Sequence, residues 1–81
     1  MSMISPEAYV IDLKDADYET LIQERNDLIE LIQDFEEKEK AGDRSGAEWN
    51  ILPSPKVQYQ LNLEYLSEIC KLMAEKYNQN N

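Results

Sequence analysis

Apolar side chains recur every three or four positions in two long segments, about residues 17–41 and 55–78, and this spacing predicts two α-helices of similar length. A shorter pattern over about residues 6–14 predicts a third helix, although its β-branched residues also permit a strand. The stretch from residue 42 to residue 55 holds both glycines and two of the three prolines, so we expect a loop at 42–54. The pattern favours a single all-α domain, an antiparallel helical hairpin with a short N-terminal helix.

Start and stop signals agree with these segments. Asp17 is a candidate N-cap for the first long helix, and Gly42 follows its last turn. Ser54 followed by Pro55 is typical of a helix start, and the pair Ser5 and Pro6 repeats the same chemistry before the short helix.

The second long helix carries two apolar lines where a surface helix needs one. The first line has the alternating spacing of a coiled coil and is expected to pack inside the hairpin: it comprises Tyr59, Leu63, Leu66, Cys70, Met73 and Tyr77. The second line, displaced by about 120°, comprises Leu61, Tyr65, Ile69 and Leu72. The first long helix has a single apolar face, formed by Tyr18, Leu21, Ile22, Leu28, Ile29, Ile32 and Phe35.

One apolar face can cover only one of the two lines, so the second line is predicted to be a homodimer interface in a four-helix bundle. A different chain in place of the second copy satisfies the same requirement. The alternative is a monomer in which the N-terminal segment and the loop around Trp49 fold over the second line.

Charge narrows the choice of partners. The chain has 17 acidic and 8 basic residues, a net charge of −9, and residues 1–41 carry most of the excess. Such a chain is a poor ligand for nucleic acids and anionic membranes, which bind Lys and Arg. The N-terminus shows neither a signal peptide nor a membrane span, so a cytoplasmic protein is expected.

An acidic ridge of Asp27, Glu30, Asp34 and Glu37 follows the polar side of the first long helix. It has three readings: a solvated surface, a docking surface for a basic protein, or a divalent metal site. Trp49 lies in the loop with apolar neighbours, where it either plugs the open end of the hairpin or anchors a partner.

Two polar residues lie among the apolar ones. Arg25 is expected to form an interhelical ion pair, with an anionic ligand or contact with water as alternatives. Asn62, between the two lines, is expected to specify the pairing of helices. Cys70 is predicted to pack in the core.

No cofactor site, metal site or catalytic set is recognisable. The chain has no histidine to deprotonate its single cysteine, and it has no glycine-rich phosphate loop. We therefore expect a non-enzymatic protein–protein interaction module. The alternative is an acidic inhibitor that imitates nucleic acid and occupies a basic groove of another protein.

The runs YETLIQERNDLIELIQDFE and WNILPSPKVQYQLNLEYLSEICKLMAEKY together resemble small uncharacterised helical proteins of phages and conjugative elements of Gram-positive bacteria. This resemblance implies a mobile-element context with no assigned activity, and it implies no functional residue.

Overall fold

A computed structural model describes residues 3–79, and this part of the chain forms three α-helices and one short 3₁₀ helix, without strands. Helix α1 spans Pro6–Leu13, α2 spans Tyr18–Lys40, the 3₁₀ helix η1 spans Ala47–Asn50, and α3 spans Pro55–Gln79. The predicted all-α fold with three helices is confirmed. Among the described residues, no helix is long and apolar enough to cross a membrane.

Local hydrogen bonds explain where the helices begin and end. The Ser5 hydroxyl accepts from the backbone N–H of Ala8, and the Asp17 carboxylate accepts from that of Thr20 at 2.8 Å. At the end of α2, Gly42 adopts a φ of +71°, which favours glycine. This conformation lets the N–H of Asp43 donate to the carbonyl of Lys38, the bond that closes a Schellman cap.

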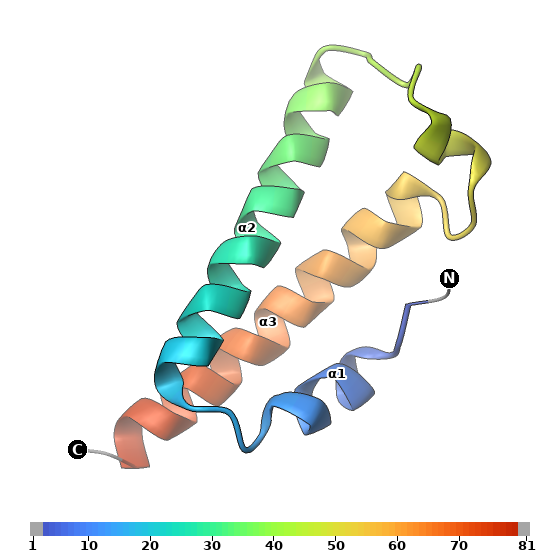
Figure 1. Cartoon of the computed structure of the whole chain (residues 1–81). Helices are drawn as coiled ribbons and strands as arrows, with labels where there is room; N and C mark the ends of the chain where they lie inside the picture. The colour runs from blue at the N-terminus through green and yellow to red at the C-terminus, as the bar shows by residue number, and fades with distance from the viewer. Residues whose placement is uncertain (1–2, 80–81) are drawn as a thin grey trace.

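Helices α2 and α3 form the predicted antiparallel hairpin, and α1 packs mainly against α3 (Figure 1). The 3₁₀ helix and its loop close the end of the hairpin that is far from both the α1–α2 turn and the last turn of α3 (Figure 1). The molecule is long and thin, with principal extents of 47, 23 and 15 Å.

The core lies where α1, α2 and α3 meet. Leu21 and Ile69 are fully buried at this junction. The remaining buried members of this core cluster are Leu28, Tyr65, Leu72 and Met73. Tyr9 of α1 stacks on Tyr65 with ring centroids 4.4 Å apart, and the Tyr65 hydroxyl donates to the backbone carbonyl of Ile4.

This arrangement corrects the predicted homodimer interface. Tyr65, Ile69 and Leu72 of the second line are 5%, 0% and 7% exposed, and Leu61 is half-buried against the same core. They are covered within one chain, because α1 brings a tyrosine ring and a backbone carbonyl to this side of α3. The N-terminal segment therefore covers more of α3 than its length suggested.

The first line also differs from its predicted place inside the hairpin. Only Met73 is buried, whereas Leu63 and Tyr77 are 40% and 58% exposed and Cys70 is exposed as well. Helix α2 packs over the strip of α3 that lies between the two lines, so the outer edge of the first line stays in solvent.

Arg25 and Asn62 are both half-buried. No ion pair of Arg25 occurs among the described residues, which corrects the predicted interhelical pair. Its guanidinium instead donates from Nε and Nη2 to Oδ1 of Asn26, the next residue of α2. Arg25 lies among the apolar residues of α2, and its hydrogen bonds to Asn26 are exposed, so its long side chain carries the guanidinium out to solvent.

Candidate partner-binding cleft

A cleft of about 140 Å³ opens where the end of α2, the 3₁₀ helix and the start of α3 converge. Three aromatic rings line it, one from each element: Phe35, Trp49 and Tyr59. Phe35 stacks on Tyr59 with centroids 4.5 Å apart and meets Trp49 at 6.4 Å. These contacts hold Trp49 over the open end of the hairpin, as the plug interpretation predicts, while one side of the ring stays in the cleft wall.

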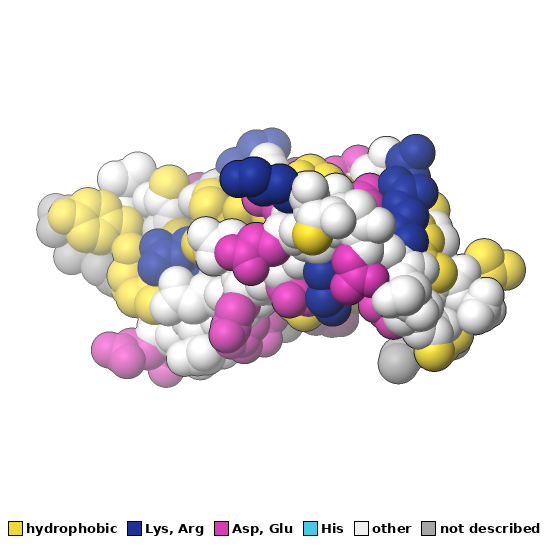
Figure 2. Space-filling view, turned by 90° about the horizontal axis from the view of Figure 1, so that it is seen from above, with side chains coloured by type: hydrophobic (Ala, Val, Ile, Leu, Met, Phe, Trp, Pro, Cys, Tyr) yellow, Lys and Arg dark blue, Asp and Glu magenta, His cyan; other side chains and the backbone are white. Residues whose placement is uncertain are grey.

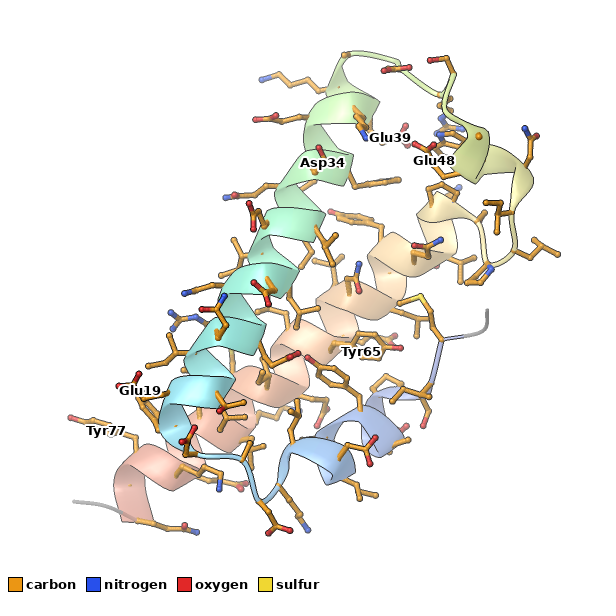
Figure 3. All side chains as sticks on the ribbon, viewed as in Figure 1. Glu19, Asp34, Glu39, Glu48, Tyr65 and Tyr77 are labelled. Atoms are coloured by element: carbon orange, nitrogen blue, oxygen red, sulfur yellow. The ribbon has the colours of Figure 1, made fainter. Side chains whose placement is uncertain are left out.

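Carboxylates surround the aromatic wall. Asp34 and Glu39 come from α2, Asp43 from the loop and Glu48 from the 3₁₀ helix. Figure 3 shows Glu39 of α2 and Glu48 of the 3₁₀ helix near each other at the loop end of the hairpin. Asp34 lies below Glu39 on α2. Seen from this end, acidic side chains gather near the middle of the molecule, with basic side chains among them (Figure 2).

Hydrogen bonds favour the ionised form of two of these carboxylates, Glu39 and Asp43. The Arg44 guanidinium holds the pKa of Glu39 below its usual value, and the Ser45 hydroxyl and N–H lower the pKa of Asp43. The hydrogen bond to Asp34 raises the pKa of Lys38, whose Nζ lies 3.2 Å from Oδ2. Lys38 lines the cleft, and Arg44 and Lys56 both act on Glu39, so these three cations leave the four carboxylates with an excess of one negative charge (4 − 3).

Arg44 shows how this cleft holds a cation. Its Nε and Nη2 donate to the two carboxylate oxygens of Glu39 at 3.0 and 2.7 Å, a bidentate pair. Its guanidinium carbon lies 4.7 Å from the centre of the Trp49 ring, within range of a cation–π contact. The rim of the cleft thus combines the two contacts that proteins use to recognise arginine.

The cleft continues onto the side of α2. A shallow surface formed by Asp27, Glu30, Leu31 and Asp34 adjoins it, and the two share Leu31 and Asp34. Leu31 is 57% exposed although it is surrounded by carboxylates. An apolar side chain in an acidic setting matches a partner that is both basic and apolar.

The predicted partner residues separate into two groups. Asp27, Glu30, Asp34 and Glu37 are all exposed, as expected for a ridge on the polar side of α2. Asp27, Glu30 and Asp34 lie on the surface that runs into the cleft at Trp49. Glu37 lies elsewhere, beside Gln33, Glu36 and Lys40.

Several residues of the cleft were not predicted from the sequence. Leu31 could have been identified, because it lies outside the main apolar face of α2 yet is as large as the residues on it. The sequence gave no comparable signal for the charged residues of the cleft, because only the fold of the loop brings them together; they are Glu39, Asp43, Arg44 and Glu48. Among the described residues, no group of three or more His, Cys, Asp or Glu side chains is placed to hold a metal ion.

Comparisons of this chain with protein-family models, with curated proteins and with solved structures found no match.

Proposed function

We propose that this protein is a non-enzymatic interaction module that binds a basic, partly apolar segment of another protein. The observation that carries this proposal is the continuity of the cleft with the acidic surface of α2 through Leu31 and Asp34. Together they join exposed carboxylates, aromatic rings and an exposed leucine on one side of the molecule. We propose that the protein acts as a dimer. That it is cytoplasmic, and that it is encoded on a mobile element, remain predictions from the sequence.

The chemistry of the cleft supports a partner that presents Lys or Arg. An incoming cation meets an aromatic wall that is already assembled, and hydrogen bonds already favour the ionised form of Glu39 and Asp43, so little reordering accompanies binding. Arg44 makes the same two kinds of contact from within the chain. A second cation bound beside it would reduce the remaining negative charge of the cleft.

An acidic inhibitor that imitates nucleic acid is the second candidate. The exposed carboxylates at helical spacing along α2 support it, including Glu37, which lies outside the cleft. A mimic of this kind uses charge along the whole ridge, whereas a cleft-binding segment requires Asp34, Glu48 and Trp49. The two candidates therefore differ in which residues binding depends on.

Trp49 is the only tryptophan in the chain, so its fluorescence reports occupation of the cleft directly. The probe is a synthetic amphipathic helical peptide with Lys and Arg on one side and Leu on the other. We expect it to change the emission of Trp49 in a saturable manner, with an affinity that falls as salt concentration rises. An equally charged peptide without Leu should bind more weakly, because it cannot use Leu31.

Two double variants with the same change in charge test the location. Asp34→Asn with Glu48→Gln removes two charges from the cleft, and we expect it to weaken binding of the probe by about tenfold or more. Glu19→Gln with Glu37→Gln removes two charges from exposed positions of α2 outside the cleft and should change affinity much less. Equal losses in the two variants would favour the mimic, and an unaltered affinity in the first would exclude the cleft.

A further inference from the structure

The side of the α2–α3 hairpin that faces away from α1 carries a second surface, which we call the open face. Tyr9 fixes the side on which α1 lies, because it stacks on Tyr65 of α3 and its hydroxyl donates to Glu24 of α2 at 3.0 Å. Side chains about 100° to 160° further around each helix axis point away from α1. The apolar members of the open face are Ile22, Ile29, Leu63, Leu66, Cys70 and Tyr77.

No element of the described chain, residues 3–79, closes over this face. Leu63 is 40% exposed and Cys70 is exposed, while Ile22, Ile29 and Leu66 are half-buried between the two helices. The exposed residues lie on one line of α3, seven positions apart, next to the half-buried residues. The result is an apolar strip along α3 that continues onto α2, where Arg25 lies between Ile22 and Ile29.

The molecule as a whole exposes more surface than a compact monomer of its mass. A compact monomer of 9.5 kDa exposes about 5,000 Å² of surface, and this chain exposes 5893 Å². Its radius of gyration is 14.4 Å, against about 12 Å for a compact domain of this length. The excess surface of about 800 to 900 Å² is close to what each partner buries in a stable protein–protein interface.

Charge determines which side of the hairpin a second copy of this chain can cover. A net charge of −9 opposes self-association through the acidic side of α2. The border of the open face mixes charged and uncharged side chains: Gln60 and Ser67 lie on α3, Asn26 of α2 accepts from Arg25, and Gln33 lies beside Glu36, Glu37 and Lys40. This border holds both signs of charge, whereas the surface at Asp27, Glu30 and Asp34 holds only carboxylates and Leu31, so two chains meet here with less repulsion.

We infer that the open face is a homodimer interface, in which two hairpins pack face to face and their four long helices surround a shared core. The α1 helices and the acidic clefts then lie on the outside of the dimer. From α3 this interface uses Leu63, Leu66, Cys70 and Tyr77 of the first line, and it does not use the buried second line. The inference rests on the dimeric part of the proposed function and is independent of what the cleft binds.

Sedimentation equilibrium of the whole chain tests the inference, because a monomer has a mass of 9.5 kDa. We expect the unaltered protein to reach twice this mass in a concentration-dependent manner, and Leu63→Glu to raise the dissociation constant at least about 100-fold. Leu52→Glu is the matched control: Leu52 is 82% exposed in the loop, so the same change there should leave the dimer intact. A monomer at all concentrations, or equal effects of the two variants, would overturn the inference.

Cys70 provides a second measurement that does not depend on a substitution. Its thiol is exposed in the single chain and lies on the open face. Its alkylation by a maleimide should therefore slow as protein concentration rises through the dissociation constant, and alkylated protein should sediment as a monomer. Alkylation at one rate at all concentrations would contradict the interface. Leu63→Glu should still bind the basic peptide, so failure of the dimer and failure of the cleft can be told apart.

Discussion

Ile69→Ala and Leu63→Ala should differ greatly in their effect on stability, although both shorten an apolar side chain of α3. Ile69 is fully buried where the three helices meet, and Leu63 is 40% exposed on the open face. Truncation at Ile69 removes three buried carbons, worth about 0.8 kcal/mol each, and leaves a cavity, so we expect a loss of about 3 to 4 kcal/mol. Truncation at Leu63 removes partly solvated carbons and leaves no closed cavity, so about 1 to 1.5 kcal/mol is expected.

Urea denaturation followed by circular dichroism measures both losses. It should be done at a protein concentration where the chain sediments as a single copy, so that self-association does not contribute to stability. The difference of about 2 kcal/mol corresponds to about 8 to 16 °C in melting temperature for a domain of this size. Equal losses, or a larger loss at Leu63, would refute the assignment of the second line to the core and of the first line to the surface.

Three further substitutions test individual contacts. Burial, followed by the hydrogen bond to Glu24, raises the pKa of Tyr9 above its usual 10.0, so the stability that the neutral phenol contributes is complete below pH 10 and is lost above it. Tyr9→Phe should therefore lessen the alkaline fall in melting temperature, and an unchanged fall would contradict this assignment. Hydrogen bonds from Thr20 lower the pKa of Asp17 below its usual 3.8, so this cap stabilises the fold above that pH and less as pH falls further. Asp17→Ala should lower the melting temperature at neutral pH but have little effect in strong acid, and an effect that is independent of pH would argue against the cap. Gly42→Ala should cost about 1 kcal/mol because of the positive φ, and urea denaturation that matches the unaltered protein would exclude a requirement for glycine there.

The ends of the helices could be predicted because their signals are local. Ser5, Asp17 and Gly42 each act through hydrogen bonds within five positions of themselves, and the sequence places those partners in fixed register. The structure begins and ends α2 within one residue of the predicted limits. Local hydrogen-bonding chemistry is sufficient for this part of the fold.

The partners of the two apolar lines could not be predicted in the same way. Periodicity shows that α3 has two lines, but it does not show which element covers each. The decisive contacts join Tyr9 and Ile4 to Tyr65, more than 50 positions away, and they depend on the direction in which the α1–α2 turn returns the chain. A tyrosine in the second line was a partial signal, because a buried phenol requires a hydrogen-bond acceptor, which an element of the same chain can supply.

The candidate site also has a part that local sequence signals predict and a part that depends on the tertiary fold. Exposure of Asp27, Glu30 and Asp34 follows from helical spacing alone, so the sequence was sufficient for the ridge. The cleft requires the loop to bring Glu48 and Trp49 back to the end of α2, and its composition contains no local signal for that return. When a loop brings the residues of a site together, the sequence can therefore identify single candidate residues but cannot predict that they form one site.

The two surfaces should respond to salt in opposite directions, because they lie on different sides of the hairpin and differ in charge. Each copy carries a net charge of −9, so two copies repel one another even when they meet through the open face. Added salt screens this repulsion and leaves burial of Leu63 unaffected, which strengthens the dimer. The same salt weakens the attraction between the carboxylates of the cleft and a basic partner. A protein built in this way can hold its own copies together and bind a basic segment at once, since neither association occupies the surface of the other.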